Sequence, residues 1–147
     1  MKIFLISEEV SDWQDAIKKT SSKLFEEGYV TNEFGEQCII REGTYPTGLN
    51  TLVPIAIPHT DSEYVHESAI CLLKPKNQVD FINMEDSETI VKAEYVLNLA
   101  IKDNKSQVPV LSKVIGLFND MELIRQVNKE DEHFLKKVIE TEMNLNS

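Results

Sequence analysis

Segments with the pattern of β-strands alternate along this chain with segments that have the 3.6-residue period of amphipathic helices. The predicted strands cover residues 2–6, 54–57, 68–74 and 88–101. The predicted helices cover residues 11–28, 32–42, 106–119, 120–127 and 132–142. Elements in this order pack best as layers, with helices against a sheet. We therefore expect an α/β layered fold, and the length suits a single domain over residues 1–147.

The first predicted helix has signals at both of its ends. Ser11 and Gln14 have the spacing of a capping box, in which two side chains satisfy free N–H groups of the first turn. Gly28 is placed to end the helix, because glycine readily takes the left-handed conformation that follows a last turn. The face between these ends that should pack on the sheet carries Trp13, Ala16, Ile17, Thr20 and Leu24.

The composition excludes several kinds of partner. The net charge is −10, so nucleic acid and anionic membrane surfaces are not expected partners. No apolar run reaches 18 residues, and the short apolar run at the N-terminus turns acidic at once, so we expect a cytoplasmic protein without direct membrane insertion. Cys38 and Cys71 both have apolar neighbours and are predicted to be buried thiols.

Residues 43–60 contain no Asp, Glu, Lys or Arg, although the rest of the chain is rich in charge. The segment includes a predicted strand that ends at Pro58 and is followed at once by His59. Pro58 fixes its own φ and favours an extended Ile57, so the histidine is held at the end of a stiff strand. Binding and catalytic groups often lie just past strand ends in α/β proteins. Because uncharged flanks favour the neutral, nucleophilic imidazole, His59 is a candidate nucleophile.

Three features around this histidine resemble one protein family. The sequence has an Arg-Glu pair at residues 41–42, a Gly-Leu turn at 48–49 and the strand PIAIPH at 54–59. In this combination and spacing they resemble the IIA components of the fructose–mannitol superfamily, which belong to the bacterial phosphoenolpyruvate-dependent sugar phosphotransferase system. The short sequences PTGL and PHTD are most similar to those of the galactitol-type branch. The resemblance implies a mixed β-sheet flanked by helices and no cofactor.

The resemblance also implies the chemistry of a phosphotransferase component with a phosphohistidine intermediate. His59 would accept a phosphoryl group from phospho-HPr and pass it to a cysteine of a IIB component, which serves a membrane IIC component during sugar uptake. Arg41 would hold the phosphoryl oxygens, because a guanidinium can bind phosphate with two hydrogen bonds. Glu42 would support the local structure, and the hydroxyls of Thr47 and Thr60 would supply further hydrogen-bond donors.

Two positions depart from the pattern of mannitol- and fructose-type members. Thr60 stands where many of them have the glycine of Pro-His-Gly, and Gln107 stands close to where they tend to carry a second histidine. A glutamine can donate a hydrogen bond to phosphate but brings no charge. We therefore include Gln107 among the supporting site residues.

The other histidines point to no metal site. His59, Asp61 and His66 could be interpreted as a metal-binding group, but a structural zinc site needs four ligands and no further Cys or His follows at a recognised spacing. We therefore expect no metal. His133 lies in a charged predicted helix and is expected to be solvated.

A protein that exchanges a phosphoryl group with His59 has to cover that histidine. The uncharged segment 43–60 is the expected contact surface, because charges there would lose their hydration at each encounter. Its apolar candidates are Leu49, Leu52 and Val53. The alternative is that these three side chains belong to the core.

The sequence leaves three alternatives to this interpretation. A IIA-like domain can sense phosphorylation in a regulator, although the sequence carries no nucleic-acid-binding domain of the kind an antiterminator has. A IIB component would have a cysteine in a Gly- and Ser-rich loop after its first strand, and neither Cys38 nor Cys71 fits that description. A hydrolase would need a Ser or Cys nucleophile motif, and none is present. The sugar is not encoded, because IIA components contact partner proteins, so galactitol rests on the resemblance alone.

Overall fold

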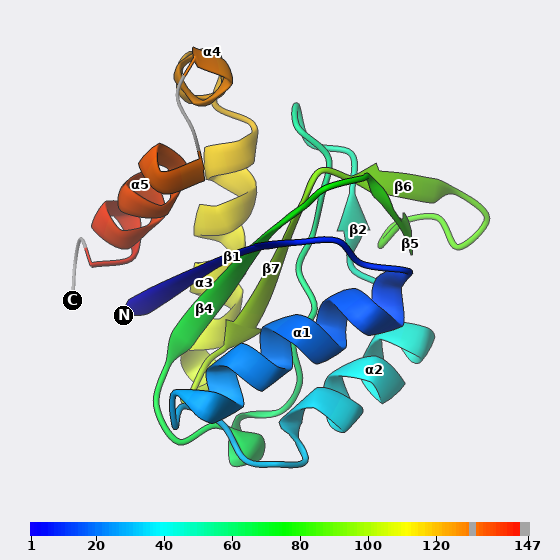
Figure 1. The fold of residues 1–147 in the computed structure, drawn as a ribbon, viewed down its shortest axis with the longest axis vertical. Helices are drawn as coiled ribbons and strands as arrows, with labels where there is room; N and C mark the ends of the chain where they lie inside the picture. Colours follow the sequence, from blue (N-terminus) through cyan, green and yellow to red (C-terminus); the bar gives the residue numbers. More distant parts are fainter. Residues whose placement is uncertain (130–131, 145–147) are drawn as a thin grey trace.

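The structure, a computed structural model, describes residues 1–129 and 132–144 and contains a five-stranded sheet. In spatial order the strands are β1 (Lys2–Glu8), β4 (Ala69–Pro75), β7 (Tyr95–Ala100), β3 (Ile55–Ala56) and β2 (Gly48–Leu49). The pairs β1–β4 and β3–β7 are parallel, whereas β4–β7 and β2–β3 are antiparallel. The sheet is therefore mixed, and helices flank it on both sides, which confirms the predicted fold class (Figure 1).

Two layers of helices cover the two faces of the sheet (Figure 1). One layer consists of α1 (Trp13–Glu26) and α2 (Phe34–Thr44). The other consists of α3 (Asn104–Phe118) and α5 (Glu132–Asn144), which are connected through α4 (Met121–Lys129). None of the helices within the described ranges is both long and apolar enough to span a membrane.

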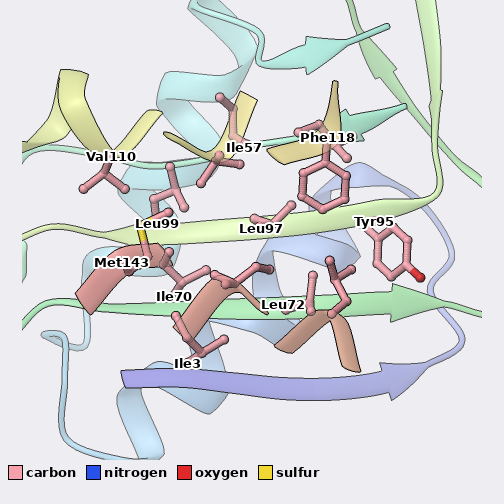
Figure 2. Close-up of a cluster of buried hydrophobic side chains, with 14 of the residues drawn as sticks. Ile3, Ile57, Ile70, Leu72, Tyr95, Leu97, Leu99, Val110, Phe118 and Met143 are labelled. Atoms are coloured by element: carbon pink, nitrogen blue, oxygen red, sulfur yellow. The ribbon is translucent and has the colours of Figure 1, made fainter. Parts of the chain in front are cut away.

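Neighbouring residues of each strand point to opposite faces of the sheet, and a cluster of buried apolar side chains covers each face. The larger cluster lies between the sheet and α3 and α5, where strand side chains such as Ile70 and Leu97 meet Val110, Phe118 and Met143 (Figure 2). On the opposite face Phe4 and Cys71 pack with residues of α1 and α2, including Ile17, Leu24, Phe34 and Cys38. Both cysteines are buried, as predicted. Burial of a large apolar side chain contributes about 1.5–3 kcal/mol, so these two clusters hold the layers together.

The prediction of one long strand over residues 88–101 is wrong. This segment forms two strands, β6 (Ile90–Ala93) and β7, which belong to different sheets. β6 pairs with β5 (Val79–Ile82), a strand that was not predicted, in a separate hairpin. In β6 exposed and buried residues alternate, whereas β7 is buried throughout. Both halves consist of good strand formers. The sequence pattern therefore does not show that the pairing strand changes at Glu94.

The ends of the first two helices differ in detail from the predicted ends. Asp12 caps α1, because its carboxylate accepts a hydrogen bond from the backbone N of Asp15 at 2.8 Å, so the predicted capping box of Ser11 and Gln14 is wrong. Gly28 has a positive φ of 87° and follows the end of α1, as predicted. α2 continues to Thr44, two residues past its predicted end. Its last turn therefore includes residues 41 and 42.

Candidate active site around His59

The backbone of His59 lies beside the central strand β7. His59 and Leu99 form an isolated parallel bridge, and the N–H of Leu99 donates to the carbonyl of Pro58 at 3.0 Å. The extended chain that begins in β3 therefore continues to the histidine, as the sequence predicts. The 3-10 turn at Ser62–Tyr64 follows directly. The side chain of His59 is half-buried, so the sheet presents it at the protein surface.

One hydrogen bond fixes the ring of His59. Its Nδ1 lies 2.8 Å from the carbonyl oxygen of Ile57. A carbonyl can only accept, so Nδ1 carries the proton and Nε2 keeps a free lone pair. Burial lowers the pKa of His59 below its ordinary 6.5, and the charge of Arg41 adds to this, while the bond to Ile57 and the charge of Asp61 oppose it. The ring is therefore neutral at neutral pH.

Arg41 and His59 line the same surface cavity, which has a volume of about 460 Å³. The cavity walls come from the last turn of α2 and the loop after it, from residues 83–85 and 87 of the β5–β6 hairpin, and from Leu111 of α3. The Nε atom of Arg41 is buried and has no hydrogen-bond partner among the described residues. The site thus combines a neutral imidazole with a cation whose donor is unsatisfied.

Glu42 follows Arg41 in the same turn but is buried. Its carboxylate accepts two hydrogen bonds from Thr47, one from the backbone N and one from Oγ1, both at 2.7 Å. Burial raises the pKa of Glu42 to about 7, although both bonds from Thr47 lower it. The Oγ1 of Thr47 in turn accepts a hydrogen bond from the backbone N of Ile57 at 3.1 Å. Hydrogen bonds therefore connect Glu42, through Thr47, to the strand that ends at His59.

Thr60 and Gln107 are also brought close to the histidine. The Nε2 of Gln107 donates to the backbone carbonyl of Thr60 at 3.2 Å, and this bond ties the first turns of α3 to the residue after His59. The side chain of Thr60 is buried. In this structure the amide donor of Gln107 is thus occupied by the backbone of the neighbouring loop.

The three apolar residues predicted to contact a partner have different environments. Leu49 is only 9% exposed and lies in the core, so the prediction that it contacts a partner is wrong. Val53 is half-buried and packs against the same cluster. Leu52 is 51% exposed, but its backbone N bonds the side chain of Asn119, which follows the C-terminal end of α3. Only Leu52 therefore presents most of its side chain to solvent.

The cavity lining also includes residues that were not predicted as site residues, among them Tyr45 and Met84. Tyr45 is 63% exposed and Met84 is 40% exposed. Tyr45 stands four residues after Arg41, a spacing that places two side chains on one helical face, so this signal was present in the sequence. No signal pointed to Met84, because the hairpin that carries it was not predicted.

Among residues 1–129 and 132–144, no group of three His, Cys, Asp or Glu side chains is placed to hold a metal ion. Both His66 and His133 are exposed.

The chain is similar to known proteins. The sequence model of the family described as "Phosphoenolpyruvate-dependent sugar phosphotransferase system, EIIA 2" matches residues 1–142. The galactitol-specific EIIA component of Escherichia coli K12 is 25% identical over 137 residues, which cover 89% of this chain and 91% of the relative. The transcriptional regulator ManR of Bacillus subtilis is 24% identical over 130 residues, which cover 87% of this chain but 19% of the regulator.

The fold has a counterpart among solved structures. The complex of enzyme IIA for mannitol with phosphorylated enzyme IIB from Escherichia coli contains a chain that superposes with a TM-score of 0.68 and 24% identity, covering 86% of this chain and 84% of that one. The match supports the fold, while the family assignment rests on the sequence model, which spans nearly the whole chain. The chain therefore belongs to the EIIA type 2 family of the phosphoenolpyruvate-dependent sugar phosphotransferase system.

Proposed function

We propose that this chain carries a phosphoryl group on Nε2 of His59, accepting it from phospho-HPr and passing it to a cysteine of a IIB component. The observation that carries the proposal is the hydrogen bond from Nδ1 of His59 to the carbonyl of Ile57. It keeps the proton on one ring nitrogen and leaves the lone pair on the other. A neutral imidazole of this kind is the nucleophile that the reaction needs.

The transfer needs no separate base. The lone pair of Nε2 attacks the phosphorus, the bond between phosphorus and the donor nitrogen breaks, and the electron pair of that bond stays with the donor. The Nδ1–H of His59 remains bonded to Ile57 throughout. In the second step the thiolate of the IIB cysteine attacks the phosphorus, and the bond to Nε2 breaks. Both steps pass through a transition state with charge spread over three equatorial oxygens, which a fixed cation stabilises.

Arg41 is proposed as that cation. It lines the cavity with His59, and its buried Nε lacks a partner among the described residues. A guanidinium binds phosphoryl oxygens through parallel N–H donors, so Arg41 can hold a phosphoryl group that enters the cavity. Thr47, Thr60 and Gln107 then have supporting roles, since their polar groups already bond one another or the backbone around His59.

The comparisons suggest the partners. The mannitol relative was solved as a complex with phosphorylated IIB, which supports a IIB component as the acceptor here. The galactitol-specific relatives suggest galactitol as the sugar. IIC would be reached only through the assembled transporter.

Phosphorylation in a purified system tests the proposal. The chain is incubated with phosphoenolpyruvate, enzyme I and HPr, and its intact mass is measured with and without IIB. We expect one acid-labile phosphate that disappears when IIB is added. His59→Ala should take up none, whereas His66→Ala and His133→Ala should be labelled like the wild type. Full labelling of His59→Ala would rule the proposal out.

A second candidate function is regulatory. The match to a segment of ManR places a domain of this kind within a transcriptional regulator. In that role the phosphate on His59 would be sensed and not passed on. Transfer to IIB separates the two functions: a chain that accepts phosphate from phospho-HPr but gives none to any IIB of the same organism would favour the regulatory role.

A further inference from the structure

A continuous path of hydrogen bonds joins the buried carboxylate of Glu42 to the ring of His59. Glu42 accepts from the N–H and the hydroxyl of Thr47, both at 2.7 Å. The hydroxyl oxygen of Thr47 accepts from the N–H of Ile57 at 3.1 Å. The carbonyl of Ile57 accepts from Nδ1 of His59 at 2.8 Å. Thr47 lines the same cavity as Arg41 and His59, so the path runs from the buried Glu42 along the edge of that cavity.

The direction of each bond follows from the groups involved. The hydroxyl of Thr47 has one hydrogen, and the N–H of Ile57 can only donate to it, so that hydrogen points to Glu42. An ionised carboxylate accepts both bonds from Thr47, whereas an amide in its place would turn an N–H group toward a donor. The charge on Glu42 therefore sets the orientation of the Thr47 hydroxyl. That hydroxyl accepts from the N–H of Ile57 at 3.1 Å, together with the backbone carbonyl of Thr47 at 3.4 Å, and these bonds hold the extended backbone at Ile57.

From this arrangement we propose that Glu42 is a positioning residue for phosphoryl transfer, acting through Thr47 and Ile57 to hold the ring of His59 with its proton on Nδ1. The proposal rests on the proposed function for its consequence in the reaction, but the claim about the ring concerns the free protein. This role is more than support of the local structure, because it links the side chain of Glu42 to the protonated nitrogen of His59.

Glu42 is adjacent to Arg41, the residue proposed to bind the phosphoryl group. Arg41 faces the cavity while Glu42 is buried, and both belong to the last turn of α2. One turn thus fixes the cation that would hold the phosphoryl group and, through the path described, the nitrogen that would attack it. Groups that must meet within a few tenths of an ångström benefit from a shared rigid support.

The test compares four variants in single-turnover phosphorylation by phospho-HPr at pH 8, above the pKa of about 7 that burial gives Glu42. Glu42→Gln and Thr47→Val should each lower the maximal rate roughly tenfold, as expected for the loss of about one hydrogen bond to a charged group. The affinity for phospho-HPr should stay unchanged. Because both residues act along one path, the double variant should be no slower than the slower single variant. Thr47→Ser keeps the hydroxyl and should restore most of the rate.

A spectroscopic readout separates positioning from general stability. In wild-type protein labelled with ¹⁵N-histidine, the His59 ring should have a protonated Nδ1 and an unprotonated Nε2. In Glu42→Gln and Thr47→Val we expect a mixture of the two tautomers. Glu36→Gln, an exposed position on the same helix, is the matched control and should change neither the tautomer nor the rate. If Glu42→Gln does not fold, Thr47→Val carries the test.

Three results would overturn the proposal: a single Nδ1–H tautomer in both variants, additive losses of rate in the double variant, or a loss of thermal stability with unchanged rate. A wild-type chain that takes no phosphate from phospho-HPr would instead overturn the proposed function. The spectra of the ring nitrogens need no phosphoryl transfer, so they would still decide whether Glu42 fixes the tautomer of His59.

Discussion

The guanidinium of Arg41 lies over the ring of Tyr45, with Cζ 5.2 Å from the ring centroid. Tyr45 directly follows the end of α2 and lines the same cavity as His59. An aromatic face attracts a cation and limits the positions that a long arginine side chain can take. We infer that Tyr45 helps to hold Arg41 in the cavity.

Loss of the ring at position 45 should slow phosphoryl transfer. An exposed cation–π contact is worth about 0.5–1 kcal/mol, so we expect Tyr45→Ala to transfer roughly two- to fivefold more slowly. Tyr45→Phe keeps the ring and should behave like the wild type. Rapid-quench measurement of labelling by phospho-HPr checks this. Equal rates for Tyr45→Ala and wild type would show that the ring does not position Arg41.

Substitution of Arg41 should have a larger effect. A hydrogen bond to a charged group contributes about 1.5–3 kcal/mol, so Arg41→Ala should slow transfer roughly ten- to a hundredfold while the fold remains intact. Arg41→Lys should recover only part of the rate, because an ammonium group lacks the planar pair of donors. Arg125→Ala, at an exposed position of α4, is the control. A normal rate in Arg41→Ala would exclude the proposed role.

The surface around the cavity should form the docking face. Met84 lines the cavity with His59, whereas the exposed Met121 lies at the start of α4. A partner that delivers or removes the phosphoryl group covers the cavity, and a charge there would have to be desolvated. We therefore expect Met84→Lys to weaken binding of IIB and Met121→Lys to leave it unchanged.

An NMR titration with HPr or IIB checks the docking face directly. The largest shifts should occur at residues 43–62 and at Met84, and α5 around His133 should be spared. Binding should weaken as salt is added, because the net charge of −10 would steer a basic partner surface. Shifts centred on α5 would contradict this face.

The lowered pKa of His59 predicts how the rate depends on pH. Burial, the main cause, keeps the ring neutral as the pH falls through 6.5, the ordinary value. In Glu42→Gln, where position 42 cannot titrate, the acidic midpoint of the phosphorylation rate should therefore lie below 6.5, where the ring becomes protonated. A parallel NMR titration of the His59 ring should have its midpoint below 6.5. A midpoint above 6.5 would contradict the effect of burial.

The raised pKa of Glu42 predicts a pH dependence of stability with a definite sign. Between 4.5, the ordinary value, and about 7, the folded chain binds more protons at this group than the unfolded chain does. The contribution of Glu42 is therefore fully present below pH 4.5 and is lost as the pH rises through about 7, by up to roughly 3 kcal/mol. Urea unfolding between pH 4.5 and 8 checks this.

The isosteric variant supplies the comparison for that experiment. Glu42→Gln cannot titrate, so its free energy of unfolding should lack the loss between pH 4.5 and about 7 that the wild type has. His59 acts in the opposite direction, because its lowered pKa removes stability as the pH falls below 6.5, and it does so in both proteins. The difference between the two proteins thus isolates Glu42, and identical profiles would refute the prediction.

The sequence by itself determined the features that depend on short stretches of chain. The φ restriction of Pro58 and the extended preference of Ile57 are local, so the strand that presents His59 could be predicted. Helical periodicity is local too, and it located α1, α2, α3 and α5 to within a few residues. The Arg-Glu, Gly-Leu and Pro-His motifs, read together, were enough to point to the family that the comparison confirms.

Only the tertiary structure decided which side chains of a segment are accessible. Leu49 and Leu52 look alike in the sequence, but Leu49 is covered and Leu52 is not. Gly48 is covered as well: a Cβ atom there would lie 2.7 Å from the carbonyl oxygen of Ile82, so the β5–β6 hairpin requires glycine at this point. The same hairpin brings Met84 into the cavity. Burial depends on segments that are distant in sequence, and local patterns do not record which distant segment will cover them.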